Sequence, residues 1–488
     1  MKKNMVAFDC GNSSCRVILG IYDGKCIKTE VILQVPNYMV RYHNYFYWDI
    51  LMIYHKLLEG LKEVQKKVDI IHSIGICTWG VDFAPFDKEG FMLQNPLSYR
   101  NTVGAEMLSK ISDEQQRFLF EETGILCDKI NSLYMIKALA MKMPQIFSVS
   151  DKILMIPDIL NYMFTGNMLN EPSEFSTTQL MNVRTQKISE RVLENMNIPQ
   201  RLFPDLGKHG EKIGNIRAEI KEYLDIKYDI PVICVPSHDT AAAVLAVPAK
   251  EEEFIFISLG TWALIGMELE KPIITEEVRK SQLTNEIGAF QKITLLRNSA
   301  GMFIIQRLKA EYEKEYSSIP WEDFNDLARG VCSPVPLFPV NENRFFNPVS
   351  MADEIWKYFK ETGQVNTEKN WAVIVAAFQY SMAFNLCLTV EKLEKVSKKQ
   401  QHKIYLVGGG SQNKRLCQLI ANVSGKKVVI GAKESTSLGN LGAQLKFFEK
   451  QQSIQDIRDI IEKNIEKMEY ICQERLSTEM MSYRNLLS

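Results

Sequence analysis

Two short polar loops in the sequence could bind phosphate groups. The first, residues 11–14 (GNSS), lies between the apolar runs 6–8 and 17–22. Its small side chains would let main-chain N–H groups approach phosphate oxygens closely. A similar loop returns near the middle of the chain, at residues 258–262 (SLGTW). These residue types are also common in hairpin turns, so each loop alone leaves that alternative open.

Carboxylates stand at the ends of two predicted strands. Asp9 directly precedes the first loop, where it could hold Mg²⁺ through water, because this ion keeps much of its hydration shell. Asp239 lies in PSHDTAAA, between an apolar strand and an alanine-rich helix. Open α/β sheets bind ligands at this strand edge, although aspartate is also an ordinary helix N-cap.

The segment CTWGVDF could contact a sugar. Trp79 offers an apolar face for a sugar ring, Gly80 permits close approach, and Asp82 can accept hydrogen bonds from hydroxyl groups. A strand and hairpin inside the core is the alternative.

Three consecutive glycines, residues 408–410, follow an apolar strand and precede a helix, so that this turn could pass close to a nucleotide. The chain contains neither G-x-x-x-x-G-K-[ST] nor G-x-G-x-x-G. If the protein uses ATP, it must therefore do so with a fold other than the P-loop fold.

Strands that alternate with helices must position these residues, which predicts mixed sheets covered by helices. The strand–loop–strand order recurs after about half the chain, which suggests duplication of one α/β unit. Besides the strands that flank the two loops, we expect helices at 51–67, 153–164 and 371–393 and from 454 onward, and strands at 71–77, 232–235 and 404–407.

The length of 488 residues exceeds what one hydrophobic core usually supports, so we expect two domains. The charged stretch PAKEEE, residues 248–253, separates the alanine-rich helix from the second strand–loop–strand unit. We therefore expect an N-terminal domain at 1–247 and a C-terminal domain at 248–488.

Composition favours a small-molecule partner in the cytoplasm. The formal net charge is −1, which gives no field to attract nucleic acid or an anionic membrane. Ten scattered cysteines without a C-x-x-C pair fit a reducing compartment, and the first residues do not resemble an export signal. Residues 370–390 could span a bilayer by length, but their Gln, Ser and Asn side chains favour a buried core helix.

Six motifs, in this order and at these separations, resemble the FGGY carbohydrate kinases over nearly the whole chain. They are DCGNSSCR, TWGVDF, SHDTAAA, LGTWAL, LVGGGSQN and ESTSLGNLGAQL. Connecting stretches such as IPDILNYMFTG, STTQL, TNEIGA and ENRFFNP resemble the members of this family that phosphorylate L-rhamnulose.

The resemblance implies an α/β fold of two actin-like, ribonuclease-H-like ATPase domains with ATP and sugar in the cleft between them. It implies Asp239 as the catalytic base, which also contacts the sugar. In such a kinase, Asp9 at the strand end would orient Mg²⁺. It implies sugar contacts at Gly80, His238 and Thr240. It implies nucleotide contacts at Asn12, Ser13, Ser14, Cys15, Arg16, Thr261, Asn298, Gln306 and Gly410, with Cys15 where relatives more usually have glycine.

One departure concerns the identity of the sugar. Similar kinases follow TWGVDF with Tyr-Arg-Asp-x-Arg, whereas this chain has Asn101 and Val103 in place of the charged pair. Charged side chains can hold sugar hydroxyl groups, so the change bears on substrate choice more than on phosphoryl transfer.

The resemblance predicts transfer of phosphate from ATP to the primary hydroxyl of a ketose, giving L-rhamnulose 1-phosphate from L-rhamnulose. Another ketose or deoxysugar, such as L-fuculose or L-xylulose, is the alternative within the kinases. A non-catalytic sensor of sugar or nucleotide is the alternative outside them, and Asp239 argues against it. The sequence leaves open whether the protein is a monomer or a homodimer.

Overall fold

The computed structural model describes residues 2–331, 333–450 and 452–487. The chain divides into two compact units. The first comprises Met1–Glu252, Glu268–Leu295 and Glu434–Ile465, and the second comprises Glu253–Met267, Leu296–Lys433 and Glu466–Ser488. The first unit therefore takes in two segments from the second half of the sequence.

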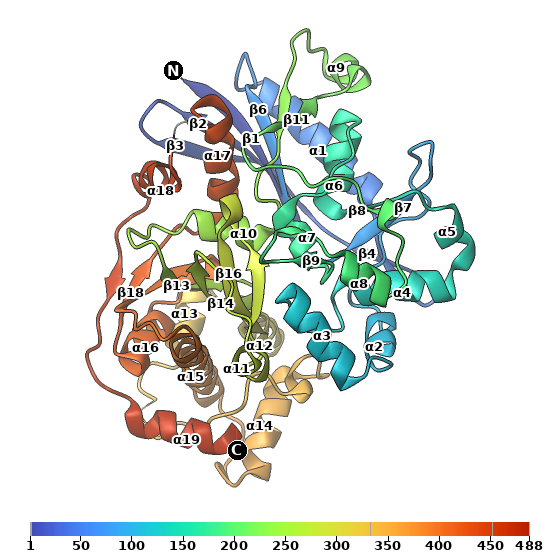
Figure 1. Cartoon of the computed structure of the whole chain (residues 1–488). Coiled ribbons are helices and arrows are strands. Elements are labelled where there is room, and N and C mark those ends of the chain that lie inside the picture. The colour runs from blue at the N-terminus through green and yellow to red at the C-terminus, as the bar shows by residue number, and fades with distance from the viewer. Residues whose placement is uncertain (1, 332, 451, 488) are drawn as a thin grey trace. The chain divides into compact units, whose positions relative to one another are not determined.

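The first unit is built on a six-stranded sheet in the order β11-β12-β6-β1-β2-β3 (Figure 1). These strands are β1 (Lys3–Cys10), β2 (Ser14–Tyr22), β3 (Ile27–Pro36), β6 (Ser73–Thr78), β11 (Lys212–Asn215) and β12 (Pro231–Ile233). β1 is antiparallel to β2 and parallel to β6, and β6 is parallel to β12. The unit also holds short strands: β4 (Met39–Tyr42), β5 (Tyr45–Trp48), β7 (Phe83–Phe86), β8 (Lys152–Met155), β9 (Met181–Asn182), β10 (Lys187–Ile188) and β15 (Thr284–Ile287).

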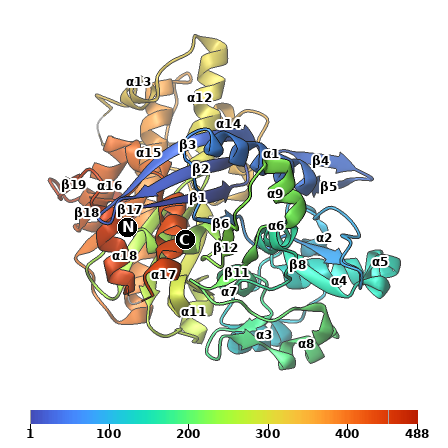
Figure 2. The same cartoon turned by 90° about the horizontal axis from the view of Figure 1, so that it is seen from above.

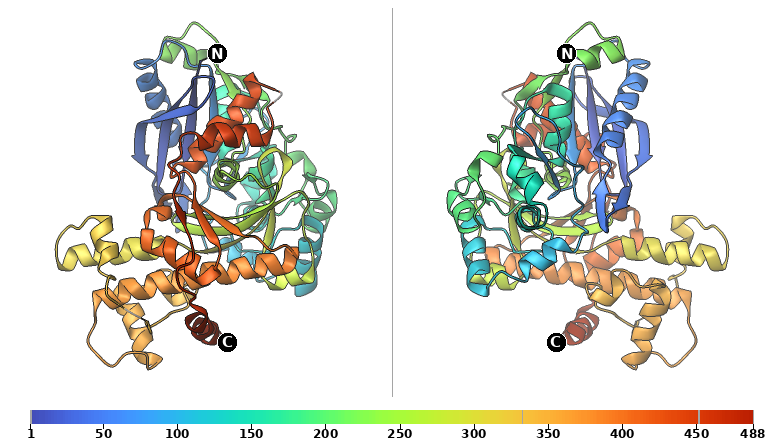
Figure 3. Two further views of the ribbon diagram at one scale, coloured as in Figure 1. Left: turned by 90° about the vertical axis from the view of Figure 1, so that its left-hand side faces the viewer. Right: turned by 90° about the vertical axis from the view of Figure 1, so that its right-hand side faces the viewer.

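The first unit also contains a series of helices. They are α1 (Ile50–Gln65), α2 (Val103–Leu108), α3 (Asp113–Thr123), α4 (Ser132–Lys142), α5 (Pro144–Val149), α6 (Ile156–Thr165), α7 (Pro172–Ser176), α8 (Glu190–Asn195), α9 (Ala218–Leu224), α10 (Asp239–Leu245), α11 (Glu276–Lys280), α17 (Ser435–Phe448) and α18 (Ile454–Glu462), with the 3-10 turns η1 (Gln200–Leu202) and η2 (Ala289–Gln291). α1 lies beside β2 and β3 (Figure 2), whereas α17 packs on β1 and β6 from the opposite face (Figure 3).

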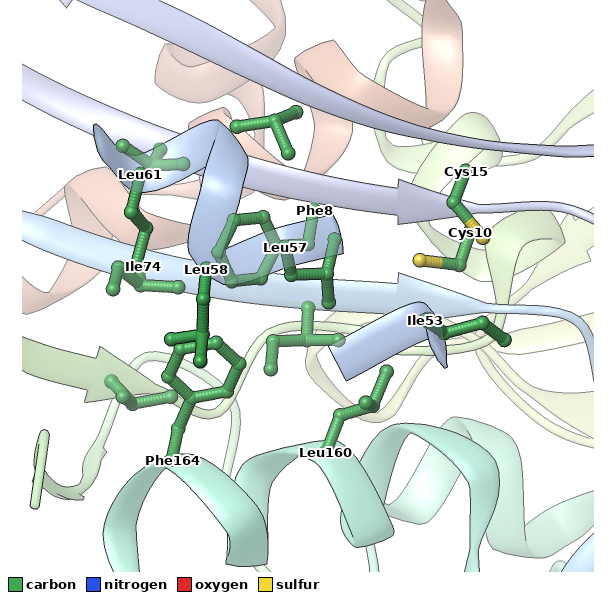
Figure 4. Packing of buried hydrophobic residues seen from close by; sticks show 14 of the residues in the cluster. Phe8, Cys10, Cys15, Ile53, Leu57, Leu58, Leu61, Ile74, Leu160 and Phe164 are labelled. Atoms are coloured by element: carbon green, nitrogen blue, oxygen red, sulfur yellow. The ribbon is translucent and has the colours of Figure 1, made fainter. Parts of the chain in front are cut away.

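The core of the first unit lies between the sheet and the helices α1 and α6. Phe8, Leu57, Ile74 and Phe164 are fully or almost fully buried there (Figure 4). Burial of each such side chain stabilises the fold by roughly 1.5–3 kcal/mol relative to its exposure to water. Because side chains alternate along a strand, every second residue of β1 and β2 points away from this core, toward α17.

The second unit repeats the strand order of the first. Its strands run β16-β14-β13-β17-β18-β19, and the parallel pairs β13–β17 and β17–β18 with antiparallel β18–β19 match β1–β6, β6–β12 and β12–β11. The strands are β13 (Phe254–Leu259), β14 (Trp262–Leu269), β16 (Ile293–Ala300), β17 (Lys403–Val407), β18 (Lys427–Ile430) and β19 (Glu469–Tyr470). The predicted recurrence of one α/β arrangement after about half the chain is thus confirmed.

The helices of the second unit are α12 (Phe303–Glu315), α13 (Trp321–Asp326), α14 (Met351–Glu361), α15 (Trp371–Ser397), α16 (Lys414–Ser424) and α19 (Ser477–Leu487), with the turns η3 (Asn343–Phe345) and η4 (Gly409–Gln412). α15 is long and apolar enough to cross a membrane, but 83% of its most apolar window is buried. Its polar side chains have partners inside the unit: Ser381 accepts a hydrogen bond from the Phe338 N–H, and the amide of Asn385 donates to Ser299. This is the pattern of a core helix.

One predicted helix begins later than expected. Residues 153–155 form most of β8, which pairs with β7, and the helix α6 starts at Ile156. Pro157 explains the boundary, because proline is favoured in the first turn of a helix and disfavours helical backbone in the residues before it.

Candidate active site

The alternation along β1 and β2 brings Asp9 and Arg16 together on the face that α17 covers. Phe8 points into the core, and its neighbour Asp9 points the opposite way. Asp9 and Arg16 are partners across the two antiparallel strands. Ser437, in the first turn of α17, contacts Asp9, and Glu434, the residue before this helix, contacts Arg16. Both lie more than 400 positions further along the sequence.

These four side chains form one polar network. Arg16 Nη2 donates to Asp9 Oδ2 over 2.5 Å, and the Ser437 hydroxyl donates to the same oxygen over 2.6 Å. Arg16 also forms an ion pair with Glu434. Burial lowers the pKa of Arg16, but the charges of Asp9 and Glu434 outweigh this effect and raise it. Arg16 is therefore a fixed cation beside the first loop.

The first loop is a tight hairpin. The Gly11 N–H donates to the Ser14 carbonyl over 2.9 Å, and Asn12 Oδ1 accepts a hydrogen bond of 3.3 Å from the Tyr99 hydroxyl. Ser13 is exposed at the tip. The Cys15 side chain is 2% exposed and packs in the core on the α1 side. Any contact of Cys15 with a nucleotide would therefore come from its main chain.

Asp239 is the first residue of α10, with His238 at the N-cap position. This agrees with the prediction of an aspartate at a helix N-terminus after a strand. The Asp239 side chain is 35% exposed, and its Oδ1 accepts a hydrogen bond of 3.1 Å from the buried hydroxyl of Thr240. Thr436 donates to the Asp239 carbonyl over 3.3 Å, so α17 also contacts this turn.

Opposing effects set the protonation of Asp239. Burial by surrounding protein atoms raises the pKa of this carboxyl group, and so does the negative charge of Asp9. The positive charge of His238 and the hydrogen bond from Thr240 lower it. A carboxylate with a raised pKa beside a cation is suited to accept a proton from a substrate.

A conformationally strained turn at Gly80 and Val81 packs against the side chain of His238. A Cβ atom on Gly80 would lie 3.2 Å from His238 Nε2 and 3.3 Å from Thr177 Cγ2, so this position leaves little room for a side chain. Val81 has a φ of 72°, which is rare for a β-branched residue. Its N–H donates to Thr177 Oγ1, and its carbonyl accepts from Ser132, which together hold the turn.

Trp79 does not offer a face to a ligand, so that prediction is wrong. Its side chain is buried, and its ring packs 4.4 Å from the ring of Trp48. The indole N–H groups of Trp48 and Trp79 both donate to Asp82 Oδ2, over 2.6 and 2.9 Å. Burial raises the pKa of Asp82 to about 7, although these hydrogen bonds oppose it. The three residues belong to the core, which was the alternative.

In the second unit, the loop between β13 and β14 is also a tight turn between two strands, one residue shorter than the first loop. The Gly260 N–H donates to the Trp262 carbonyl over 2.9 Å. The carbonyl of Thr261 accepts from the Phe303 N–H at the start of α12, one turn before the exposed Gln306. Asn298 is exposed on β16, the strand beside β14.

The glycine turn after β17 packs against the end of β13. A Cβ atom on Gly410 would lie 2.4 Å from Leu259 Cγ, and Gly408 has a φ of 86°. Leu259 directly precedes the Gly260–Thr261 turn. The second unit therefore gathers Thr261 and Gly410 at the end of β13, with Gln306 one helical turn further along α12.

The described residues contain no group of three or more His, Cys, Asp and Glu side chains that could hold a metal ion. Mg²⁺ does not require such a cage, because it is often bound by one or two carboxylates together with water and substrate phosphates. Asp9 could supply one carboxylate, since the hydrogen bonds from Arg16 and Ser437 both go to its Oδ2.

Sequence reasoning missed one charged residue of this site, Glu286 on β15. Its Oε2 atom lies 3.3 Å from Nδ1 of His238, and both side chains are 11% exposed. Glu286 falls within the stretch TNEIGA, which drew attention for its resemblance to relatives but contains no catalytic pattern. Glu286 lies 48 residues after His238 in the sequence, and no sequence pattern indicates that the two side chains are in contact.

Asn101 and Val103, where the chain departs from similar kinases, have structural roles. The Asn101 amide accepts from the Phe46 N–H and donates to the carbonyls of Phe46 and Ser98, each over 2.8 Å. An aspartate could not make the two donor contacts. Val103 is 3% exposed at the start of α2. Asn101 thus fixes the edge of β5.

Comparisons with known proteins agree with this arrangement. The sequence matches the N-terminal domain of the FGGY family of carbohydrate kinases over residues 4–246 and its C-terminal domain over residues 255–446. A rhamnulokinase from Bacteroides thetaiotaomicron is 34% identical over 480 residues, 97% of each chain. A rhamnulokinase from Oceanobacillus iheyensis is 35% identical over 474 residues, 96% of this chain and 98% of the relative.

A solved structure shares the fold. The xylulose kinase from Lactobacillus acidophilus superposes with a TM-score of 0.81 at 16% identity, covering 99% of this chain and 96% of that one. The expected two-domain α/β architecture is confirmed. The chain belongs to the FGGY family of carbohydrate kinases.

Proposed function

We propose that this kinase transfers the terminal phosphate of ATP to the primary hydroxyl of L-rhamnulose and yields L-rhamnulose 1-phosphate and ADP. The observation that carries the choice of sugar is the similarity to rhamnulokinases, at 34–35% identity over nearly the full length of each chain. Similarity of this extent covers both the phosphate loops and the residues around Asp239.

Asp239 is the proposed base. Its carboxylate is the partly exposed acidic group of the α10 N-terminus, and Thr240 and His238 fix its orientation and charge. General-base catalysis requires a carboxylate that is ionised before the reaction and accepts a proton during it. Gly80, His238 and Thr240 are the proposed sugar contacts, and they surround this carboxylate in the first unit.

The nucleotide is assigned to the two hairpin loops and the glycine turn. The proposed contacts are Asn12, Ser13, Ser14, Arg16 and the Cys15 main chain in the first unit, and Thr261, Asn298, Gln306 and Gly410 in the second. The recurrence of a tight polar loop between corresponding strands of the two units supports the assignment. We place the functional domains at 1–247, with the sugar contacts, the base and the first loop, and at 248–488, with the remaining nucleotide contacts.

The chemistry of phosphoryl transfer implies Mg²⁺, which neutralises charge on the phosphates when it is bound. Asp9 is the residue that would hold it through water. The nine described cysteines are free thiols, which supports a reducing, cytoplasmic location.

The test of the substrate is an ADP-release assay over a panel of ketoses that includes L-rhamnulose, L-fuculose and L-xylulose. We expect the highest kcat/KM with L-rhamnulose. A higher kcat/KM with another ketose would overturn the choice of sugar. Asn101 and Val103 favour no other sugar, because Asn101 binds main-chain groups and Val103 is buried.

A further inference from the structure

His238 stands between two carboxylates. Its Nδ1 lies 3.3 Å from Glu286 Oε2, and its Nε2 lies 3.6 Å from Asp239 Oδ1. A neutral imidazole has one N–H and one lone pair, so it would turn a lone pair toward one of the two carboxylates. Both contacts are ion pairs, and the doubly protonated imidazolium places a positive charge beside each carboxylate.

Glu286 is held in place by its strand. The adjacent Ile287 N–H donates to the hydroxyl of Ser176 in α7 over 3.0 Å. On the other side, the amide of Asn285 donates to the carbonyls of Gly124 and Ile273. These contacts fix the main chain of β15 on both sides of Glu286. The carboxylate therefore reaches His238 from a rigid element of the first unit.

We infer that Glu286 is a positioning residue of this kinase: by pairing with Nδ1, it keeps His238 an imidazolium whose Nε2–H faces Asp239 and the proposed sugar contact at Gly80. This inference rests on the proposed role of Asp239. Glu286 itself need not touch the substrate, because it acts through His238.

The electrostatics of the site support the inference. Burial lowers the pKa of His238, but the contact with Glu286 and the charges of Glu286, Asp239 and Glu171 outweigh it and raise the pKa to about 9. Glu171, at the N-cap of α7, is itself paired with His209. Of the carboxylates that face His238, Glu286 has the largest effect. At neutral pH the imidazolium in turn lowers the pKa of Asp239.

The consequence for catalysis is that Asp239 can stay ionised although it is partly buried. Burial alone would favour a protonated Asp239, which could not accept a proton. The His238 cation opposes this effect, and Glu286 offsets the cost of burying that cation. The three residues together keep the base ionised in a partly buried site, with His238 available as a hydrogen-bond donor to a sugar oxygen.

The test is the substitution Glu286→Gln, which removes the charge and preserves the shape of the side chain. In a wild-type enzyme, the alkaline limb of the kcat/KM profile for the sugar should reflect loss of the His238 proton near pH 9. In the variant we expect this limb to move down by roughly two pH units, toward the ordinary histidine value. At pH 8, between the two limbs, kcat/KM for the sugar should therefore fall about tenfold relative to the wild type, with the KM for ATP unchanged.

Two further variants make the result specific. Glu286→Asp retains the charge and should restore the alkaline limb toward that of the wild type. Glu114→Gln makes the same change at an exposed position in the first turn of α3 and should leave the profile unchanged. A wild-type profile and a wild-type kcat/KM in Glu286→Gln would overturn the inference.

A direct measurement covers the case in which Glu286→Gln fails to fold. The NMR titration of histidine side chains in the wild-type protein, assigned with His238→Gln, should show His238 titrating near pH 9. Titration at or below the ordinary histidine value would overturn the inference. Neither result depends on the identity of the sugar, whereas full activity of Asp239→Asn would instead overturn the proposed function.

Discussion

Ser437 donates a hydrogen bond of 2.6 Å to Asp9, although 428 positions separate the two residues in the sequence. The bond connects the first turn of α17 to the end of β1, where the loop of residues 11–14 begins. It shows how the last third of the chain returns to complete the first unit. Gly439, one half-turn later, lets α17 contact the main chain of Ala242 in α10.

Removal of the Ser437 hydroxyl should destabilise the loop that follows Asp9. Ser437→Ala leaves the Asp9 carboxylate with one buried donor fewer, and a hydrogen bond to a charged group contributes about 1.5–3 kcal/mol. We expect the free energy of unfolding in urea to fall by about that amount, and the KM for ATP to rise. Ser148→Ala, at an exposed position on α5, is the matched control. Equal stability of both variants would contradict a structural role for the bond.

Asn101→Asp should destabilise the β4–β5 hairpin without changing the choice of sugar. The aspartate loses two hydrogen bonds to the carbonyls of Phe46 and Ser98 and places a negative charge beside them. We expect a loss of about 1–3 kcal/mol in urea unfolding. The ketose panel should keep its rank order. A changed order with unchanged stability would show that residue 101 selects the sugar.

Asp82→Asn should stabilise the protein more at alkaline than at acidic pH. The raised pKa of Asp82 means that the folded protein keeps this proton up to about pH 7, whereas the unfolded chain loses it near the ordinary aspartate value. Wild-type stability therefore falls as the pH rises through this window. The asparagine keeps an oxygen for the two indole N–H groups and does not titrate.

Urea unfolding at several pH values measures the effect. The advantage of Asp82→Asn should grow as the pH rises from about 4 to about 7, up to a few kcal/mol. An advantage that is constant with pH would show that Asp82 is ionised in the folded protein throughout this range.

Gly410→Ala should weaken ATP binding in particular. The added Cβ would overlap Leu259 at the strand end that precedes Thr261, and overpacking of this kind costs about 1–3 kcal/mol. We expect the KM for ATP to rise at least about fivefold, with the KM for the sugar unchanged. Gly409→Ala is the matched control, since a Cβ there meets no atom within 4 Å. Equal effects of both variants would argue against the role of this turn.

The sequence predicted those parts of the site that depend on local pattern. The strands and loops at Asp9–Ser14 and at Ser258–Trp262, and the helix that begins at Asp239, follow from hydrophobic runs interrupted by small polar residues. Local sequence patterns do not predict contacts between side chains that are far apart in the sequence. Nothing in the segment around Glu286 indicates that it reaches His238, and the interpretation of Trp79 failed because the residue type alone does not tell which face of the chain is buried.

The conformation of the hairpin β4–β5 was not predicted either. Its second strand, YFYW, is wholly aromatic, and it is held by the side chain of Asn101, 55 positions after Phe46. The sequence marked Asn101 as unusual and suggested a role in sugar choice. Only the structure shows that its amide extends the main-chain pairing of β5 with residues 96–98.

The role of Asp239 is tested most directly by the turnover of Asp239→Asn with L-rhamnulose and ATP. The asparagine preserves the size of the side chain and cannot accept the proton. We predict that kcat falls at least about 100-fold while ATP still binds, as measured by calorimetry. Turnover at the wild-type rate in this variant would contradict the assignment of Asp239 as the base.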